Sequence, residues 1–279
     1  NILTEEELNN LTADELVAII KDLTNYEHRV LYFGPKSEEE LVAALNENHR
    51  MPENMKEIPS GKEFVEQENE GTKVYVVDYD MKQAEIMMLS KKEMYNPETV
   101  AAAAIFNEYF GGGMGSIVFQ EMRESKALAY SVYSVYRSPS DSSKSHYTMA
   151  YIGTQADKLA EAMTGMTDLL NNMPESEKSF ELAKKAAIEK IRTERITKAS
   201  KIFNYETALK RGVNRDLRKD IYDAIPNMTM EDLKAFHQKY IQDGEYNIMV
   251  IGKKEGLNMD ALAKYGPVET LSLEDVFGY

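Results

Sequence analysis

The same order of sequence signals occurs twice in this chain, once near its start and once near its end. Thr12-Ala-Asp-Glu15 has the form of a helix-capping box, and an amphipathic helix leads from it into the extended, apolar stretch Arg29–Phe33 and a glycine. Thr229-Met-Glu-Asp232 opens a second unit of this kind, whose helix leads into Tyr246–Ile251 and another glycine. Such an order also recurs by chance, but a repeat displaced by about one domain length favours two related domains.

This repeat predicts the domain organisation. Residues 1–47 contain only helix–strand–helix elements like those that end the second domain. We therefore expect them to be the end of a truncated preceding domain. Residues 48–71 are rich in proline, glycine and charged side chains, which is typical of a linker. Residues 72–279 are long enough for one complete domain with its own core. Because the chain begins with Asn1 and not with methionine, we expect further sequence upstream.

Strands and helices alternate in blocks along the complete domain. Runs of β-branched and aromatic residues predict strands at 73–79, 84–89, 129–136, 146–152 and 246–251. Apolar periodicity predicts helices at 97–106, 154–172 and 175–201, and a short helix that ends near residue 125. This order predicts an α+β fold in which helices pack on one face of a mixed, largely antiparallel sheet.

Composition excludes several classes of function. The chain has 47 acidic and 33 basic residues, and its formal charge of −14 opposes long-range attraction to a nucleic-acid backbone. No apolar run approaches the roughly 20 residues that cross a bilayer. The absence of cysteine removes disulfides, thiolate metal sites and cysteine nucleophiles. We therefore expect a soluble protein of bacterial type, and its compartment stays open between the cytoplasm and an extracytoplasmic space.

One segment is locally basic. Residues 178–219 carry thirteen Lys or Arg against five Asp or Glu. Such a run is typical of a solvated helix face with internal ion pairs, which is the interpretation we favour. The alternative is a wall that attracts an acidic peptide or partner surface.

Motifs for independent catalysis are missing. The four histidines stand far apart in the sequence, and none lies in a His-x-x-Glu-His or His-Glu-x-x-His pattern, so we expect no metal or cofactor in this chain. No Gly-x-Ser-x-Gly elbow is present either. The glycine cluster Gly111–Ser116 lacks the Gly-Lys-Ser/Thr ending of a phosphate loop, so a turn for close helix packing is the favoured interpretation over an anion site.

The run from Gly111 to Tyr133, GGGMGSIVFQEMRESKALAYSVY, resembles a segment of the pitrilysin/insulinase family of zinc metallopeptidases. There a glycine-rich turn opens a helix that carries an arginine, and a Leu-Ala-Tyr-Ser strand follows. The later order of a basic helix, a Thr-x-x-Asp-Leu helix and a final strand extends the resemblance over residues 72–279, and residues 12–34 are similar to the end of a preceding family domain.

This resemblance implies a place within a larger enzyme. Family members are built from two halves that enclose a chamber for peptides, and zinc is bound by a His-x-x-Glu-His motif in the first half. That motif is absent here, so the chain resembles the zinc-free, carboxyl-terminal half. The implied partners are a zinc-binding amino-terminal half, in the same chain or a companion subunit, and a peptide substrate. The chain alone should be inactive.

Arg123 and Tyr130 match the family pair that reaches toward the zinc site of the other half. The resemblance implies that Tyr130 donates a hydrogen bond to the oxyanion and that Arg123 holds a substrate carbonyl. The structural alternative is an arginine at the end of its helix and an ordinary strand tyrosine. The alternative function is a catalytically inactive assembly or peptide-binding subunit of the same fold.

Overall fold

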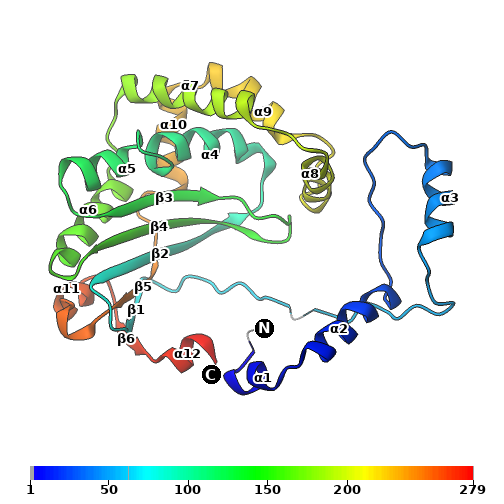
Figure 1. Cartoon of the computed structure of the whole chain (residues 1–279). Coiled ribbons are helices and arrows are strands. Elements are labelled where there is room, and N and C mark those ends of the chain that lie inside the picture. Colours follow the sequence, from blue (N-terminus) through cyan, green and yellow to red (C-terminus); the bar gives the residue numbers. More distant parts are fainter. Residues whose placement is uncertain (1–2, 62, 279) are drawn as a thin grey trace. The chain divides into compact units, whose positions relative to one another are not determined.

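The computed structural model describes residues 3–61 and 63–278. Contacts divide the chain into two units (Figure 1). The sheet unit comprises Glu66–Arg195 and Tyr205–Val276, and the N-terminal unit comprises Asn1–Val65, Ile196–Asn204 and Phe277–Tyr279. The boundaries that we placed at residues 47 and 71 stay predictions. In the described part of the chain, no helix has both the length and the apolar character that crossing a membrane requires.

The sheet unit is built on six strands in the order β3-β4-β2-β5-β1-β6. Their bounds are β1 Lys73–Asp78, β2 Gln83–Met94, β3 Ser131–Arg137, β4 Ser145–Gln155, β5 Asn247–Gly252 and β6 Val268–Leu271. The pairs β3/β4, β4/β2 and β2/β5 are antiparallel, whereas β5/β1 and β1/β6 are parallel. This confirms the predicted mixed sheet. The short edge strand β6 was not predicted, and β5 separates β1 from β2.

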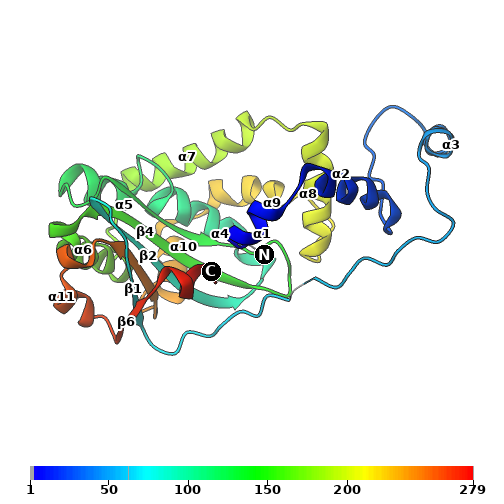
Figure 2. The same ribbon diagram turned by 60° about the horizontal axis from the view of Figure 1, so that its bottom comes forward.

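Helices cover one face of this sheet, and α4, α5 and α7 lie on the same side of it in Figures 1 and 2. The helices and helical turns after β2 are η2 Pro97–Thr99, α4 Val100–Phe106, η3 Asn107–Gly111, α5 Ile117–Phe119, η4 Gln120–Ser125, η5 Ala156–Lys158, α6 Leu159–Asn171, α7 Glu177–Thr193, α8 Lys198–Lys210, α9 Leu217–Ala224, η6 Ile225–Asn227, α10 Met230–Tyr240, η7 Lys254–Gly256, α11 Met259–Ala263 and α12 Leu273–Phe277. Of these, α8 and α12 each have residues in both units. Two of the turns, η3 and η4, are π-helical.

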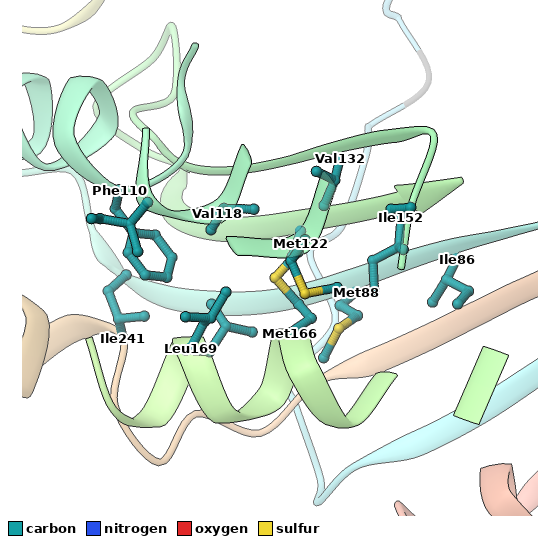
Figure 3. Packing of buried hydrophobic residues seen from close by; sticks show 14 of the residues in the cluster. Ile86, Met88, Phe110, Val118, Met122, Val132, Ile152, Met166, Leu169 and Ile241 are labelled. Atoms are coloured by element: carbon teal, nitrogen blue, oxygen red, sulfur yellow. The ribbon is translucent and has the colours of Figure 1, made fainter. Parts of the chain in front are cut away.

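The core lies between the sheet and this helical layer. Alternate strand residues such as Ile86, Ile152 and Val250 are fully buried, as period-two packing on one face requires. Figure 3 shows Met122 of η4 with Met88 and Met166 in the centre of the cluster. Unbranched methionines fill the irregular space between strand and helix.

The single helix predicted at 175–201 is wrong at residues 194–197, where the structure breaks it into α7 and α8. α7 ends at Thr193, and Glu194 is extended with ψ 121°. The break falls in a stretch of β-branched residues, which lower helix propensity. Thr197 then begins a new helix, because its Oγ1 accepts a hydrogen bond from the Ser200 amide at 3.1 Å.

The N-terminal unit contains α1 Glu5–Asn10, α2 Ala13–Asp22, η1 Leu23–Asn25 and α3 Glu38–Asn48, joined by extended chain. Capping boxes begin all three α-helices, as the sequence predicts for α2. The strand predicted at Arg29–Phe33 is wrong, because this segment pairs with no strand among the described residues. The nearest pairing is one isolated bridge from Tyr26 to Lys56.

The outer edge of β3 is covered by η3. The side-chain amide of Asn107 donates to the carbonyl oxygen of Tyr136 at 2.9 Å and accepts from its N–H at 2.8 Å. Gly111, at the end of the same turn, approaches the β3 backbone so closely that an added Cβ would lie 2.1 Å from the Ser134 carbonyl oxygen. The glycine cluster therefore serves close packing at Gly111.

We expect Gly111→Ala to lower the free energy of unfolding by about 2 kcal/mol or more, because backbone and not a flexible side chain must move to admit the methyl group. Gly113→Ala is the matched control, since nothing lies within 4 Å of its Cβ position. Urea unfolding of both variants measures the difference. Equal stability of the two variants would contradict the expectation, because it would show that the backbone near Gly111 can move to admit a methyl group without loss of stability.

Two buried histidines predict how stability changes with pH. Burial lowers the pKa of His146 and of His237 below the ordinary 6.5, and His237 Nε2 also lies 2.7 Å from the Leu170 carbonyl oxygen. The unfolded chain therefore binds more protons than the folded chain below about pH 6.5, so stability falls as pH falls. The slope is at most about 1.4 kcal/mol per pH unit for each histidine.

We expect His237→Gln, which keeps an N–H donor toward Leu170, to flatten this dependence. Urea midpoints at about pH 7.5 and about pH 5.5 test it against the unsubstituted chain. His28→Gln is the control, because His28 is exposed. An unchanged difference between the two pH values in His237→Gln would contradict the expectation.

Candidate functional site

Arg123 stands on a π-helical turn that extends α5. Ser116 begins the helix by accepting from the Phe119 amide at 3.4 Å, and the Lys126 amide closes the wide turn on the Glu121 carbonyl at 3.1 Å. π-Turns are rare and occur often at functional sites. The wide turn buries Met122 fully and leaves Arg123 exposed at its end.

The chain between Arg123 and Tyr130 reverses through a left-handed residue. Ala127 has φ +48°, a conformation that favours glycine. The Lys158 ammonium donates to the Ala127 carbonyl oxygen at 2.9 Å, and the Leu128 amide donates to the Met122 carbonyl at 2.8 Å. The turn is thus held from both sides.

Tyr130 immediately precedes β3 and is fixed through its backbone. Its N–H donates to the Gly153 carbonyl of β4 at 2.8 Å, and Thr154 Oγ1 donates to the Leu128 carbonyl at 2.6 Å. The phenol itself is 71% exposed. The backbone is therefore anchored to the sheet while the side chain stays accessible.

The structure brings the two predicted site residues together. The Arg123 guanidinium carbon lies 5.5 Å from the centre of the Tyr130 ring and 4.9 Å from that of Phe119, which are cation–π distances. The nearest carboxylate oxygen belongs to Glu124, 3.7 Å from Arg123 Nε. The side chain of Arg123 is 41% exposed. Neither Arg123 nor Tyr130 is enclosed in the core.

A pocket of about 240 Å³ opens beside this pair. Its walls include Arg123, Tyr130 and Lys158, the apolar residues 127–129 of the turn, and the polar side chains of Gln83, Thr154 and Gln155. It presents a guanidinium, a phenol and an ammonium group, all hydrogen-bond donors. Such a set can bind carbonyl oxygens, carboxylates or a developing negative charge.

The histidines do not build a metal site on the chain described here. His146 and His237 are buried, whereas the exposed His28 and the partly exposed His49 lie with their Nε2 atoms 2.7 Å apart. In residues 3–61 and 63–278, no group of three or more His, Asp or Glu side chains could hold a metal ion. We derive no step from a metal bound by this chain.

Among residues that the structure describes, six of the thirteen basic side chains at 178–219 form ion pairs, three of them with carboxylates outside the segment. Ion pairs join Lys184 to Glu181, Lys190 to Glu108, Arg192 to Glu189, Arg215 to Asp220, Arg218 to Asp216 and Glu194, and Lys219 to Asp223. This pattern supports the favoured interpretation of a solvated helical face.

The sheet unit is an α+β domain with a six-stranded mixed sheet and helices packed on one face. The model of the peptidase M16 inactive domain matches residues 10–187, which is more than half of the chain. The chain therefore belongs to this family. This confirms the resemblance to the inactive half of a metallopeptidase that the motif around Arg123 indicated.

Solved structures share the fold. A peptidase M16 inactive domain from Pseudomonas fluorescens is 17% identical with a TM-score of 0.63, and covers 89% of this chain and 59% of its own. A protease from Helicobacter pylori is 13% identical with a TM-score of 0.64, and covers 89% of this chain and 61% of its own. This chain thus spans about three-fifths of their length. No protein of curated function matches significantly.

Lys158 is the charged pocket residue that sequence reasoning missed, together with the polar Gln83, Thr154 and Gln155. Lys158 follows β4, at the end of η5 and directly before α6. Nothing in its local sequence distinguishes it from the other lysines. Only the pairing of β3 with β4 brings it to the Ala127 turn.

We expect Ala127→Gly to raise stability by up to about 1 kcal/mol, because glycine adopts φ +48° without the Cβ penalty. Ala129→Gly is the control, since Ala129 has no positive φ and is buried, so this change should destabilise. Thermal unfolding measures both. A loss of stability in Ala127→Gly as large as in Ala129→Gly would contradict the strain at Ala127.

Proposed function

We propose that this chain is the zinc-free portion of a zinc metallopeptidase that degrades peptides in an enclosed chamber. Arg123 and Tyr130 contribute substrate and transition-state contacts at a metal site held by the other half. The observation that carries this proposal is their shared exposure beside one pocket, with the guanidinium stacked on the Tyr130 ring. The family membership supports it independently.

Tyr130 is the oxyanion donor in this proposal. Peptide hydrolysis builds negative charge on the scissile carbonyl oxygen, and a fixed phenol O–H stabilises that charge more than it stabilises the neutral ground state. The backbone hydrogen bond to Gly153 holds Tyr130 at the end of the sheet. The exposed ring leaves the hydroxyl free to reach a substrate.

Arg123 positions the substrate backbone. Its planar guanidinium can donate to a peptide carbonyl oxygen, and stacking between Phe119 and Tyr130 restricts its orientation before substrate binds. Restricting the donor in advance lowers the entropic cost of holding the scissile bond in register. Zinc bound by the other half would supply the polarisation of the carbonyl and the activated water.

We further propose that residues 1–47 close a preceding domain of the same family. Ile19 and Ile20 of α2 and Leu23 directly after it are 57%, 64% and 61% exposed. The corresponding helix in the sheet unit, α10, buries Leu233 and Phe236 against a complete core. An exposed face of this kind needs a covering layer, which a preceding domain would supply.

In the complete enzyme we expect Tyr130→Phe to lower kcat by one or more orders of magnitude with a smaller effect on KM, because the donor acts mainly in the transition state. Tyr133→Phe is the matched control: it removes a hydroxyl three residues further along, on β3, where Tyr133 stacks on Tyr151 outside the pocket. Steady-state cleavage of a quenched-fluorescence peptide measures both. An unchanged kcat in Tyr130→Phe would remove Tyr130 from the mechanism.

The alternative, an inactive assembly or peptide-binding subunit, makes a different prediction. The complete protein, with any companion subunit, would bind peptide without cleaving it, and no His-x-x-Glu-His motif would occur upstream or in the companion. Zinc stoichiometry of the complete protein, measured with peptide turnover, separates the two functions. Stoichiometric zinc with turnover by the present chain alone would defeat both.

A further inference from the structure

Lys158 places a positive charge in the pocket without a matching negative one. Its ammonium donates one hydrogen bond, to the Ala127 carbonyl oxygen at 2.9 Å, and it forms no ion pair with any described residue. An ammonium group has three donors, so two N–H groups are left for another acceptor. The side chain is half-buried, so its charge is less screened by solvent than that of a surface lysine.

The charges around the pocket are unbalanced. Its lining contains two cations, Arg123 and Lys158, and no acidic side chain. The acidic groups next to these cations in the chain are Glu124, which lies 3.7 Å from Arg123 Nε, and the exposed Asp157 and Glu161, which stand on either side of Lys158 in the sequence. This contrasts with a chain whose formal charge is −14. A local excess of donors and positive charge selects an anionic group.

The helix that carries Lys158 adds to this field. The helical turn η5 and then α6 begin at the pocket, and neither Gln155 nor Lys158 makes a side-chain cap hydrogen bond. The amide groups at the start of the helix carry partial positive charge, which the exposed Asp157 and Glu161 in the first turns of η5 and α6 offset in part.

The pocket is small. Its volume of about 240 Å³ is below the range of roughly 300–1,000 Å³ that is typical of whole small-molecule sites. One side chain or one chain terminus fits this space better than an extended ligand. Arg123 and Tyr130, which face the same space, would hold the adjoining peptide backbone.

We propose that this pocket is a carboxylate-binding subsite, in which Lys158 selects peptides that present a carboxylate next to the scissile bond. This inference rests on the proposed peptidase function. The carboxylate has two sources in peptides, an acidic side chain and a free carboxyl terminus, and both share the chemistry that Lys158 recognises. Lys158 is a specificity residue, because Arg123 and Tyr130 remain the residues at the reacting carbonyl.

The test uses the complete peptidase and matched peptides. In the first pair, one peptide has a free carboxyl terminus and the other has a carboxamide. In the second pair both peptides end in a carboxamide, and one has Glu where the other has Gln next to the cleaved bond. We expect the unsubstituted enzyme to favour the acid member of at least one pair about tenfold in kcat/KM, and the pair that shows the preference identifies the source.

Lys158→Met should abolish this preference by lowering kcat/KM on the acid peptide alone, whereas Lys158→Arg should retain it. Lys126→Met is the matched control, because Lys126 lies in the same turn but pairs with Glu121 at 3.6 Å outside the pocket. An equal loss on acid and neutral peptides in Lys158→Met would assign Lys158 to holding the Ala127 turn, and would overturn the proposal. So would the absence of any acid preference in the unsubstituted enzyme.

Binding separates this proposal from the proposed function. Fluorescence anisotropy of the labelled acid and amide peptides reports the preference in the complete protein whether or not cleavage occurs. Binding that favours the acid peptides and is lost in Lys158→Met, without turnover, would retain the carboxylate subsite and reject the peptidase role. Turnover without discrimination between the members of either pair would retain the peptidase role and reject the carboxylate subsite.

Discussion

The fold depends on β5 pairing with strands from the start of the domain on both of its sides. β5 pairs in antiparallel fashion with β2 and in parallel with β1, so a strand from near the end of the chain lies inside a sheet begun at Lys73. Its residues Ile248 and Val250 are buried against the helical layer. Without both neighbours, its backbone N–H and C=O groups would lie unpaired in the interior. The candidate site lies at β3 and β4, and β4 is connected to β5 through β2, which pairs with both.

The two copies of the helix–strand repeat show which features of a fold are local and which are not. Capping boxes occur at both Thr12 and Thr229, because a cap needs only residues three positions apart. The extended segment becomes β5 in one copy, but Arg29–Phe33 pairs with no strand in the described chain. Apolar, extended sequence makes a strand only where other strands offer hydrogen-bond partners. The sequence therefore predicted the mixed sheet and its helical layer, but not this outcome.

The candidate site was predictable to the extent that it follows a continuous motif. Arg123 and Tyr130 lie seven positions apart in one recognisable run, and the structure places them side by side. The roles given to them stay predictions. Lys158 and the wall around it were not predictable, because their position follows from the β3/β4 register and from a left-handed turn at an alanine. The π-helical turns were equally hidden, since apolar periodicity does not separate them from an α-helix.

The amide of Asn107 has a consequence for how this protein avoids self-association. β3 is an edge strand, and an exposed edge is a template on which a second copy or an unfolded chain can add a strand. By satisfying both backbone groups of Tyr136, Asn107 acts as a one-residue substitute for that missing strand. The close approach of Gly111 blocks the neighbouring position at Ser134. The edge is thereby shielded against β-mediated aggregation along its carboxyl-terminal half.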